Sequence, residues 1–234
     1  MSWHLSRMCG FDLETTGVDV EADRIVTATV VQCGGGQPTV PANWLADPGI
    51  DIPEAAAKVH GITTERARAE GKPAAEVVAE VLAALGQVIA SGIPVVAMNA
   101  RYDLTLLDRE AARYGLPPLP AGPVIDPLVL DKQVDRYRKG RRTLTALCEH
   151  HQVPLGAAHT SEADAIAACR VAWRIGHTRP ALAALSLAEL HTAQVGWAAE
   201  QAASLQAHLR KTDPAAHCPP AWPLIPRQQN GDPR

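Results

Sequence analysis

The sequence predicts a mixed α/β fold, in which a five-stranded sheet carries helices on both faces. Two observations favour this class. Up to about residue 45 the chain contains three short apolar segments separated by turn residues, a pattern typical of consecutive strands. From residue 73 onward, apolar residues recur at helical spacing between further short apolar runs, so helices and strands are expected to alternate.

The first three strands are expected at residues 7–13, 25–33 and 38–45. The second of them (IVTATVVQC) is rich in the β-branched residues that favour strands, whereas the third has the weakest pattern. Residues 17–23 and 34–36, which separate the strands, contain glycine and other turn residues. Because short turns join neighbouring antiparallel strands, these segments predict an antiparallel meander.

The remaining elements follow from changes in apolar spacing. Residues 73–89 form a helical pattern that starts with Pro73, a residue suited to the first helical position, and stops before Gly92. The wholly apolar residues 93–98 (IPVVAM) predict a strand buried on both faces. A fifth strand is expected at 124–130, and further helices at 103–114, 143–151, 161–175 and 186–210.

The C-terminal part differs in composition from the rest. Ser186 and Glu189 have the spacing of a capping box, which places the start of the last helix. From residue 212 the chain contains six prolines and is expected to be extended or loosely attached. We therefore expect a main domain at 1–178, a helical extension packed on it at 179–211, and a Pro-rich tail at 212–234.

Composition restricts the class of protein. Hydrophobic residues make up 47% and charged residues 20% of the 234 residues, as in soluble globular proteins. The net charge of −3 argues against a basic, sequence-specific DNA-binding module, but not against a nuclease, since metal-binding carboxylates lower the total. The five cysteines form no CxxC pair, so neither a disulfide framework nor a zinc knuckle is expected. Without a signal-like leader or an apolar run of about 18 residues, we expect a cytoplasmic protein with no membrane attachment.

Two carboxylates lie close together at the end of the first predicted strand. Asp12 and Glu14 share one face of the strand, because successive side chains alternate. Carboxylates so close repel each other and raise each other's pKa unless a cation lies between them. Oxygen ligands of this kind suit Mg²⁺ or Mn²⁺. The alternative is a solvated acidic pair at a turn without a function.

Two further carboxylates follow predicted elements. Asp103 comes shortly after the buried strand at 93–98, where ligands gather in open α/β sheets, although an Asp at this place can also be a helix N-cap. Asp164 lies in the first turn of the helix at 161–175, and His159 precedes that helix. The alternative for this segment is a structural capping box formed by Ser161 and Asp164, with a surface histidine that has no role.

Together these segments resemble the DEDDh exonucleases, the DnaQ-like proofreading family with a ribonuclease-H-like fold. The resemblance runs from about residue 8 to residue 174 and rests on residues 11–17 (FDLETTG), 59–63 (VHGIT), 99–103 (NARYD) and the His159–Asp164 spacing. Thr160 stands where the tyrosine branch of the superfamily has tyrosine, so the histidine branch is favoured. One departure is Met98, which stands where the family often has histidine, and we expect it to tune the pocket without loss of activity.

The resemblance implies a role for each of these residues. Asp12, Glu14, Asp103 and Asp164 would hold two Mg²⁺ or Mn²⁺ ions, and His159 would be the general base for the attacking water. The implied activity is 3′→5′ removal of nucleoside 5′-monophosphates from single-stranded ends of DNA, with RNA as the less favoured substrate. Asp126, an acidic position commonly seen in the family, is read as structural and not as a ligand.

Substrate contacts are expected in two places. The resemblance implies that Leu13, Thr15, Thr16 and His60 lie around the terminal nucleotide. The run at 136–142 (RYRKGRR) has five cations in seven residues, and it predicts a phosphate-binding patch that includes Arg138 and Arg141. The alternative is a solvated loop.

The apolar stripe of the helix at 186–210 predicts core packing or a homodimer face, and DNA polymerase III subunits are expected as partners if the chain serves in proofreading. Two other functions stay open at this point. One is a catalytically silent ribonuclease-H-like module that binds nucleic acid or a partner protein. The other is a small-molecule phosphohydrolase.

Overall fold

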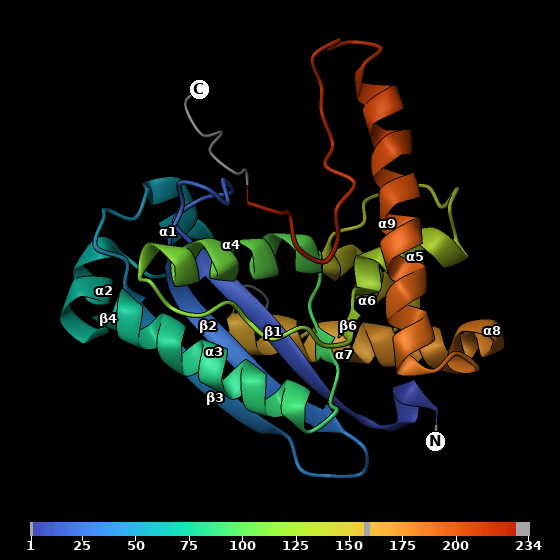
Figure 1. Ribbon diagram of the computed structural model, residues 1–234, viewed down its shortest axis with the longest axis horizontal. Coiled ribbons are helices and arrows are strands. Elements are labelled where there is room, and N and C mark those ends of the chain that lie inside the picture. Colours follow the sequence, from blue (N-terminus) through green and yellow to red (C-terminus); the bar gives the residue numbers. More distant parts are fainter. Residues whose placement is uncertain (1, 157–159, 228–234) are drawn as a thin grey trace, which may run out of the picture.

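The computed structural model describes residues 2–156 and 160–227 (Figure 1). Within these residues one mixed sheet has the strand order β4-β3-β2-β1-β5-β6. Strands β1 (Arg7–Thr15), β2 (Ile25–Gly34) and β3 (Val40–Asp47) form an antiparallel meander, whereas β5 (Val95–Val96) and β6 (Val124–Ile125) continue the sheet in parallel beside β1. The predicted α/β class and the meander are confirmed.

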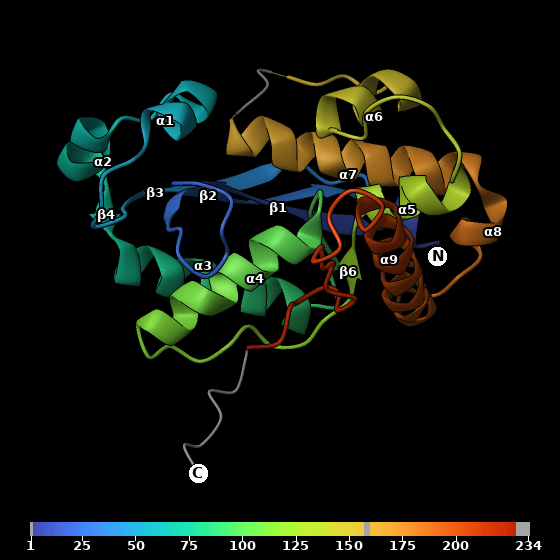
Figure 2. The same ribbon diagram turned by 90° about the horizontal axis from the view of Figure 1, so that it is seen from above.

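Helices cover both faces of the sheet, as Figure 2 shows. The helices α3 (Ala74–Ala90) and α4 (Ala100–Arg113) lie on one face, and α6 (Leu144–His151) and α7 (Ser161–Thr178) lie on the other. Side chains alternate along β1 between two hydrophobic clusters: Phe11 and its neighbours pack with α3 and α4, whereas Met8 packs with α7. The sheet therefore separates two cores, and the end of β1 lies between them.

The sheet has six strands in the described residues, one more than the five that the sequence predicted. Strand β4 (Lys72–Pro73) pairs in parallel with the end of β3, at Ala46 and Asp47. A two-residue edge strand that contains proline has no strand-like sequence pattern. Pro73 is consequently the residue before α3 and not its first helical residue. Helices α1 (Glu54–His60) and α2 (Thr64–Glu70) also form in a segment for which the sequence predicted no element.

The prediction of a fifth strand at 124–130 is correct for residues 124 and 125 and wrong for the residues after them. Strand β6 stops at Ile125, and α5 (Pro127–Val134) begins two residues later. The side chain of Asp126 accepts a hydrogen bond from the Leu128 N–H at 2.9 Å, and Pro127 takes the first helical position. An N-cap followed by proline starts a helix even within an apolar run.

Two more helices, α8 (Pro180–Ala183) and α9 (Leu187–Leu209), follow α7, and the capping box of Ser186 and Glu189 at the start of α9 is confirmed. Of the helices in the described part of the chain, none is long and apolar enough to cross a membrane. The division into domain, extension and tail stays a prediction.

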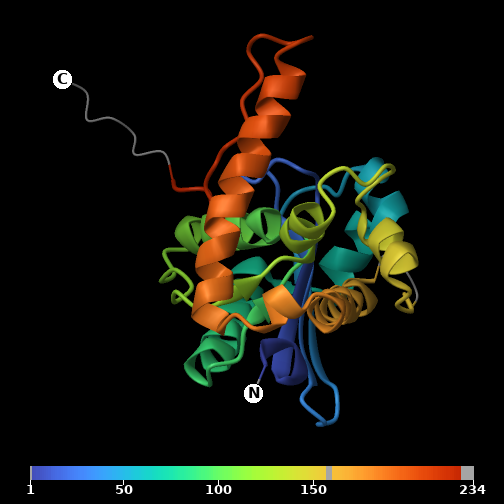
Figure 3. The same ribbon diagram turned by 90° about the vertical axis from the view of Figure 1, so that its right-hand side faces the viewer.

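The tail is extended, but the described part of it is not loosely attached. After α9 the chain turns back and runs along this helix towards α4 (Figures 1 and 3). Trp222 is only 6% exposed, and its Nε1 donates to Asp126 Oδ2 at 3.3 Å. The Ile225 N–H donates to Thr105 Oγ1 at 3.0 Å. The expectation of loose attachment is therefore wrong up to residue 227, because an indole and the backbone bind the buried side of α4 and α5.

Candidate active site

A glycine in β1 allows α7 to pack closely on this strand. Gly10 shares a face of β1 with Asp12 and Glu14, and α7 packs across this face. A Cβ atom at Gly10 would lie 2.5 Å from the backbone carbonyl oxygen of Ala165. Only glycine permits so close an approach, and the contact brings the first turn of α7 next to the end of β1.

The first turn of α7 carries Asp164 to the β1 carboxylates. Ligand oxygens of Asp12, Glu14 and Asp164 all lie within 4.8 Å of one another. Ser161 fixes the helix start against β2, because its Oγ lies 2.9 Å from Thr29 Oγ1. The N-cap is Thr160, whose side chain accepts a hydrogen bond from Ala163 N. The alternative of a Ser161–Asp164 capping box is therefore wrong.

Asp103 reaches the same strand from α4. Strand β5 pairs with β1 at Cys9 and Gly10, and beyond Gly10 this edge of β1 has no strand partner among residues 2–156 and 160–227. There the Leu13 N–H donates to Asp103 Oδ1 at 3.1 Å. Asp103 is buried and belongs to the first turn of α4, which begins three residues before it, so it is not an N-cap.

A buried aspartate holds this turn of α4. Asn99 has a left-handed backbone (φ 62°), and its N–H donates to Asp126 Oδ1 at 3.0 Å. The Ala100 N–H donates to Asp126 Oδ2, also at 3.0 Å. Because Asp126 also caps α5 and accepts from Trp222, it joins two helix starts and the tail. These contacts agree with the structural role expected for Asp126.

The carboxylates strongly affect one another's ionisation. Burial, together with the charges of Asp103, Glu14 and Asp164, raises the pKa of Asp12 well above its usual value. Burial and the Asp164 charge raise the pKa of Glu14 to about 7. Burial raises the pKa of Asp103 to about 8, although the Leu13 hydrogen bond opposes this shift. These shifts disfavour the ionised forms of Asp12, Glu14 and Asp103 unless cations compensate their charge, and the donor set consists of carboxylate oxygens, which suit hard divalent ions.

Of the residues around the end of β1 that are expected to contact the terminal nucleotide, two lie beside the carboxylates and the next one is used within a loop. Leu13 and Thr15 belong to β1 beside the carboxylates, and Thr15 Oγ1 donates to Gly17 O at 2.6 Å. The Thr16 hydroxyl is buried and used within its own loop: it donates to Asp23 Oδ1 at 2.7 Å. Thr16 therefore shapes the loop between β1 and β2.

His60 lies near this end of β1. Burial lowers the pKa of His60, an effect that the neighbouring Thr15 backbone partly offsets. Its Nδ1 accepts from the Ile62 N–H at 3.1 Å, and its Nε2 is buried without a well-formed hydrogen bond to any described residue. A neutral imidazole with one unsatisfied nitrogen can still bind a ligand.

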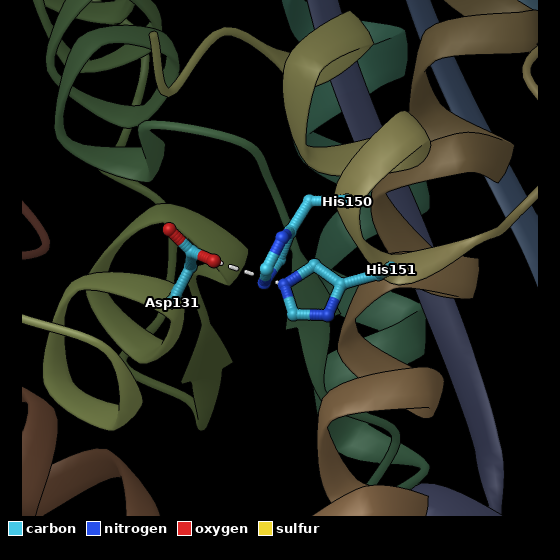
Figure 4. Close-up of side chains that lie close together, drawn as sticks. All are labelled: Asp131, His150 and His151. Carbon is cyan, nitrogen blue, oxygen red and sulfur yellow. Dashed lines mark hydrogen bonds and ion pairs between the residues drawn. The ribbon is translucent and has the colours of Figure 1, made fainter. Parts of the chain in front are cut away.

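The basic run at 136–142 is partly structural. Arg138 Nη2 lies 2.9 Å from Asp131 Oδ2, and Arg142 binds the same carboxylate. Figure 4 shows His151, whose Nε2 lies 2.9 Å from Asp131 Oδ1. Burial alone would raise the pKa of Asp131, but hydrogen bonds from His151, Arg138 and Arg142 hold it well below its usual range. Arg141 is exposed, so it and not Arg138 is available to a ligand.

The family follows from a comparison with known proteins. Residues 9–172 match the RNase_T exonuclease family. The chain belongs to this exonuclease family. The matched segment contains the four acidic positions of this exonuclease and also His159, which lies outside the described residues. The family predicted from the sequence is confirmed.

Relatives and solved structures agree with this assignment. The exonuclease is 29% identical over 155 residues to a PolC-type DNA polymerase III of Lacticaseibacillus paracasei, which is 66% of this chain but 10% of that protein. Exonuclease I of Escherichia coli in complex with a dT13 oligonucleotide superposes with a TM-score of 0.63 at 19% identity, over 76% of this chain and 42% of that chain. Its zinc-bound complex with single-stranded DNA gives 0.64 at 20% identity, over 75% and 41%. The likeness shows that the fold is ribonuclease-H-like.

Proposed function

We propose that this exonuclease removes nucleoside 5′-monophosphates from the 3′ end of single-stranded DNA, and acts less readily on RNA. The observation that carries the proposal is the convergence of Asp12, Glu14 and Asp164 within 4.8 Å, with Asp103 bound to the same strand end. Since the chain spans about a tenth of the length of the polymerases that it matches, their activity supports the proposal only by analogy. DNA is favoured because those relatives are DNA polymerases and exonuclease I binds dT13.

The roles of the residues follow from their positions. Asp12, Glu14, Asp103 and Asp164 would hold two Mg²⁺ or Mn²⁺ ions. When bound, such ions lower the pKa of a water molecule and neutralise charge on the leaving 3′ oxygen. His159, five residues before Asp164, would accept the proton from the attacking water, a role that suits histidine because its ordinary pKa lies near neutral pH. The hydrogen bond from the Leu13 N–H would hold the Asp103 carboxylate in place at this site.

The terminal nucleotide would lie against the end of β1. Leu13 and Thr15 offer backbone and side-chain contacts there, and the half-buried His60 lines the same pocket. Thr16 supports this wall through its bond to Asp23. Arg141 is an exposed cation that can reach a phosphate further along the strand.

A time course with 3′- and 5′-labelled single-stranded DNA and RNA tests the proposal. We expect Mn²⁺ to support a ladder that shortens from the 3′ end, and we expect Asp12→Ala and His159→Ala to abolish it. Intact oligonucleotides that still bind would instead identify a catalytically silent binding module. Faster cleavage of a chromogenic phosphodiester than of an oligonucleotide would identify a small-molecule phosphohydrolase.

We further propose a cytoplasmic role in proofreading, with DNA polymerase III subunits as partners. The polymerase relatives support this role, since the matched segment lies within PolC-type chains. Co-purification with a replicative polymerase subunit tests the partner. A homodimer through α9 stays a prediction that sedimentation equilibrium tests.

A further inference from the structure

A groove lies between α5 and the distal half of α9. It has a volume of about 380 Å³, and α9 lies outside the segment that matches the exonuclease family. Figures 1 and 3 show α9 crossing beside α5. Lys132, Arg136 and Arg142 line one wall, and His208 and Glu200 line the other. This chain therefore adds to the exonuclease domain a groove that α9 helps to build.

The groove carries an excess of positive charge. Residues 131–142 contain six Lys or Arg and two Asp. Asp131 is already shared by Arg138 and Arg142. In the described part of the chain, the side chains of Lys132 and Arg136 make no hydrogen bond or ion pair with any residue. Glu200, the carboxylate that lines the groove, is exposed on the opposite wall. Two cations in the groove are thus free to bind an anion.

Of the two cations, Lys132 gives the stronger indication that the groove binds an anion. Its side chain is half-buried on α5, and burial lowers its pKa; the guanidinium groups of Arg142 and Arg101 lower it further, against the opposing charges of Asp126 and Asp131. A desolvated ammonium beside like charges is unfavourable. A phosphate in the groove would offset the free-energy cost of burying this ammonium, because it brings a negative charge to the unpaired cation.

The groove is connected to the catalytic end of the molecule. A small adjoining cavity of about 50 Å³ shares Lys132, Gln201 and Leu205 with the groove. It extends to Asn99 and Arg101 in the first turn of α4, the turn that carries Asp103. The groove therefore adjoins the start of α4, the helix whose first turn carries Asp103.

We propose that the groove between α5 and α9 binds the phosphodiester backbone of the strand whose 3′ end lies at the four carboxylates. The inference rests on the proposed function, since that function places the strand end. Lys132 and Arg136 both line this groove, and a nucleic-acid strand carries a negative charge at each phosphate. Tyr137 is 87% exposed beside Arg136 and is available to stack on a base.

A charge-matched pair of variants tests the groove. The test variant is Lys132→Gln/Arg136→Gln. The control is Arg179→Gln/Lys211→Gln, which removes the same charge from two exposed cationic residues that do not line the groove. Binding of oligo(dT) strands of about 3 to about 15 nucleotides is measured in EDTA over a range of salt concentrations. The wild type is expected to gain affinity with length.

We expect the test variant to bind the long strands about tenfold more weakly. Its salt slope should be about 1.4 units shallower, because each lost phosphate contact on a single strand accounts for about 0.7. In Mn²⁺ it should still hydrolyse the shortest strand at the wild-type rate. The control should keep the affinity and slope of the wild type.

Equal losses in both variants, or unchanged binding of long strands by the test variant, would overturn the proposal. Titration of inorganic phosphate provides a second arm: loss of phosphate binding with unchanged strand binding would assign the groove to a free anion and also overturn it. Binding in EDTA needs no catalysis. A wild type that binds strands through the groove but hydrolyses none would therefore count against the proposed function and not against the groove.

Discussion

Gly10 of β1 and Ala165 of α7 are in backbone contact, and this contact places Asp164 beside Asp12 and Glu14. A Cβ atom at position 10 would approach the Ala165 carbonyl oxygen to 2.5 Å and its carbonyl carbon to 2.9 Å. Since both partners are backbone atoms, a larger residue can be accommodated only by a shift of the helix. The geometry of the carboxylates therefore depends on a residue that has no chemistry of its own.

We expect Gly10→Ala to lower the free energy of unfolding by about 1–3 kcal/mol, as overpacked core positions do. Exonuclease activity should fall more than tenfold even where the protein stays folded, because Asp164 moves with α7. Urea denaturation and hydrolysis of single-stranded DNA measure the two effects. Gly86→Ala in α3 is the control: a Cβ there meets nothing within 4 Å, so stability should rise by up to about 1 kcal/mol.

The metal-free protein should become less stable as pH rises. The pKa of Glu14 is raised from 4.5 to about 7 and that of Asp103 from 3.8 to about 8. The folded state therefore keeps protons that the unfolded chain has already released, so its stabilisation is complete below about pH 4 and is lost up to about pH 8. The slope is at most about 1.4 kcal/mol per pH unit for each such proton.

Chemical denaturation in EDTA at several pH values measures this slope. Asp103→Asn should reduce it, because the amide does not titrate. Saturating Mn²⁺ should also reduce it, because bound cations favour the ionised carboxylates. A stability that rises with pH over the same range in EDTA would contradict the assignment.

Removal of the Asp126 carboxylate should loosen the turn that carries Asp103. Asp126→Ala leaves the N–H groups of Asn99, Ala100 and Leu128 without their acceptor, and each buried unsatisfied donor costs about 1–3 kcal/mol. We expect severe destabilisation, measured by thermal unfolding. Trp222→Phe keeps most of the buried ring and loses one donor, so it should cost no more than about 1.5 kcal/mol. If the two variants were equally stable, Asp126 would not organise this region.

Arg138 and Arg141 should behave differently although they lie three residues apart. Arg138→Gln removes a partner of the buried Asp131, and we expect a loss of about 1–3 kcal/mol in stability because Arg142 and His151 remain. Arg141→Gln should leave stability within about 0.5 kcal/mol and raise KM for long strands, since its side chain is exposed. Denaturation midpoints and steady-state kinetics separate the two roles. An unchanged KM in Arg141→Gln would remove Arg141 from the substrate contacts.

Local patterns predicted what depends on local geometry. The alternation of β1 placed Asp12 and Glu14 on one face, and the capping box placed the start of α9. The exact start of α4 was missed because it depends on the left-handed backbone of Asn99 and on Asp126, which is 27 residues away. The change from strand to helix within residues 124–130 was missed because the strand and the start of the helix are similarly apolar.

Contacts between distant segments could not be predicted in the same way. Nothing in the basic run at 136–142 distinguishes Arg138, which binds a buried aspartate, from the exposed Arg141. Nor does a proline-rich composition show that Trp222 enters the core. Both depend on partners that the fold brings together only after the elements have packed.

The hydrogen bond from Trp222 to Asp126 also has a consequence for the timing of folding during synthesis. The two residues are 96 positions apart. A ribosome that adds about 5–20 residues per second needs about 5–20 s to cover this distance. In the later part of that interval, after residue 164, the nascent chain contains all four acidic residues of the site but not the indole that covers Asp126. Nascent chains arrested shortly before residue 222 should therefore be cleaved by proteases near α4 and α5 more readily than chains arrested well beyond it.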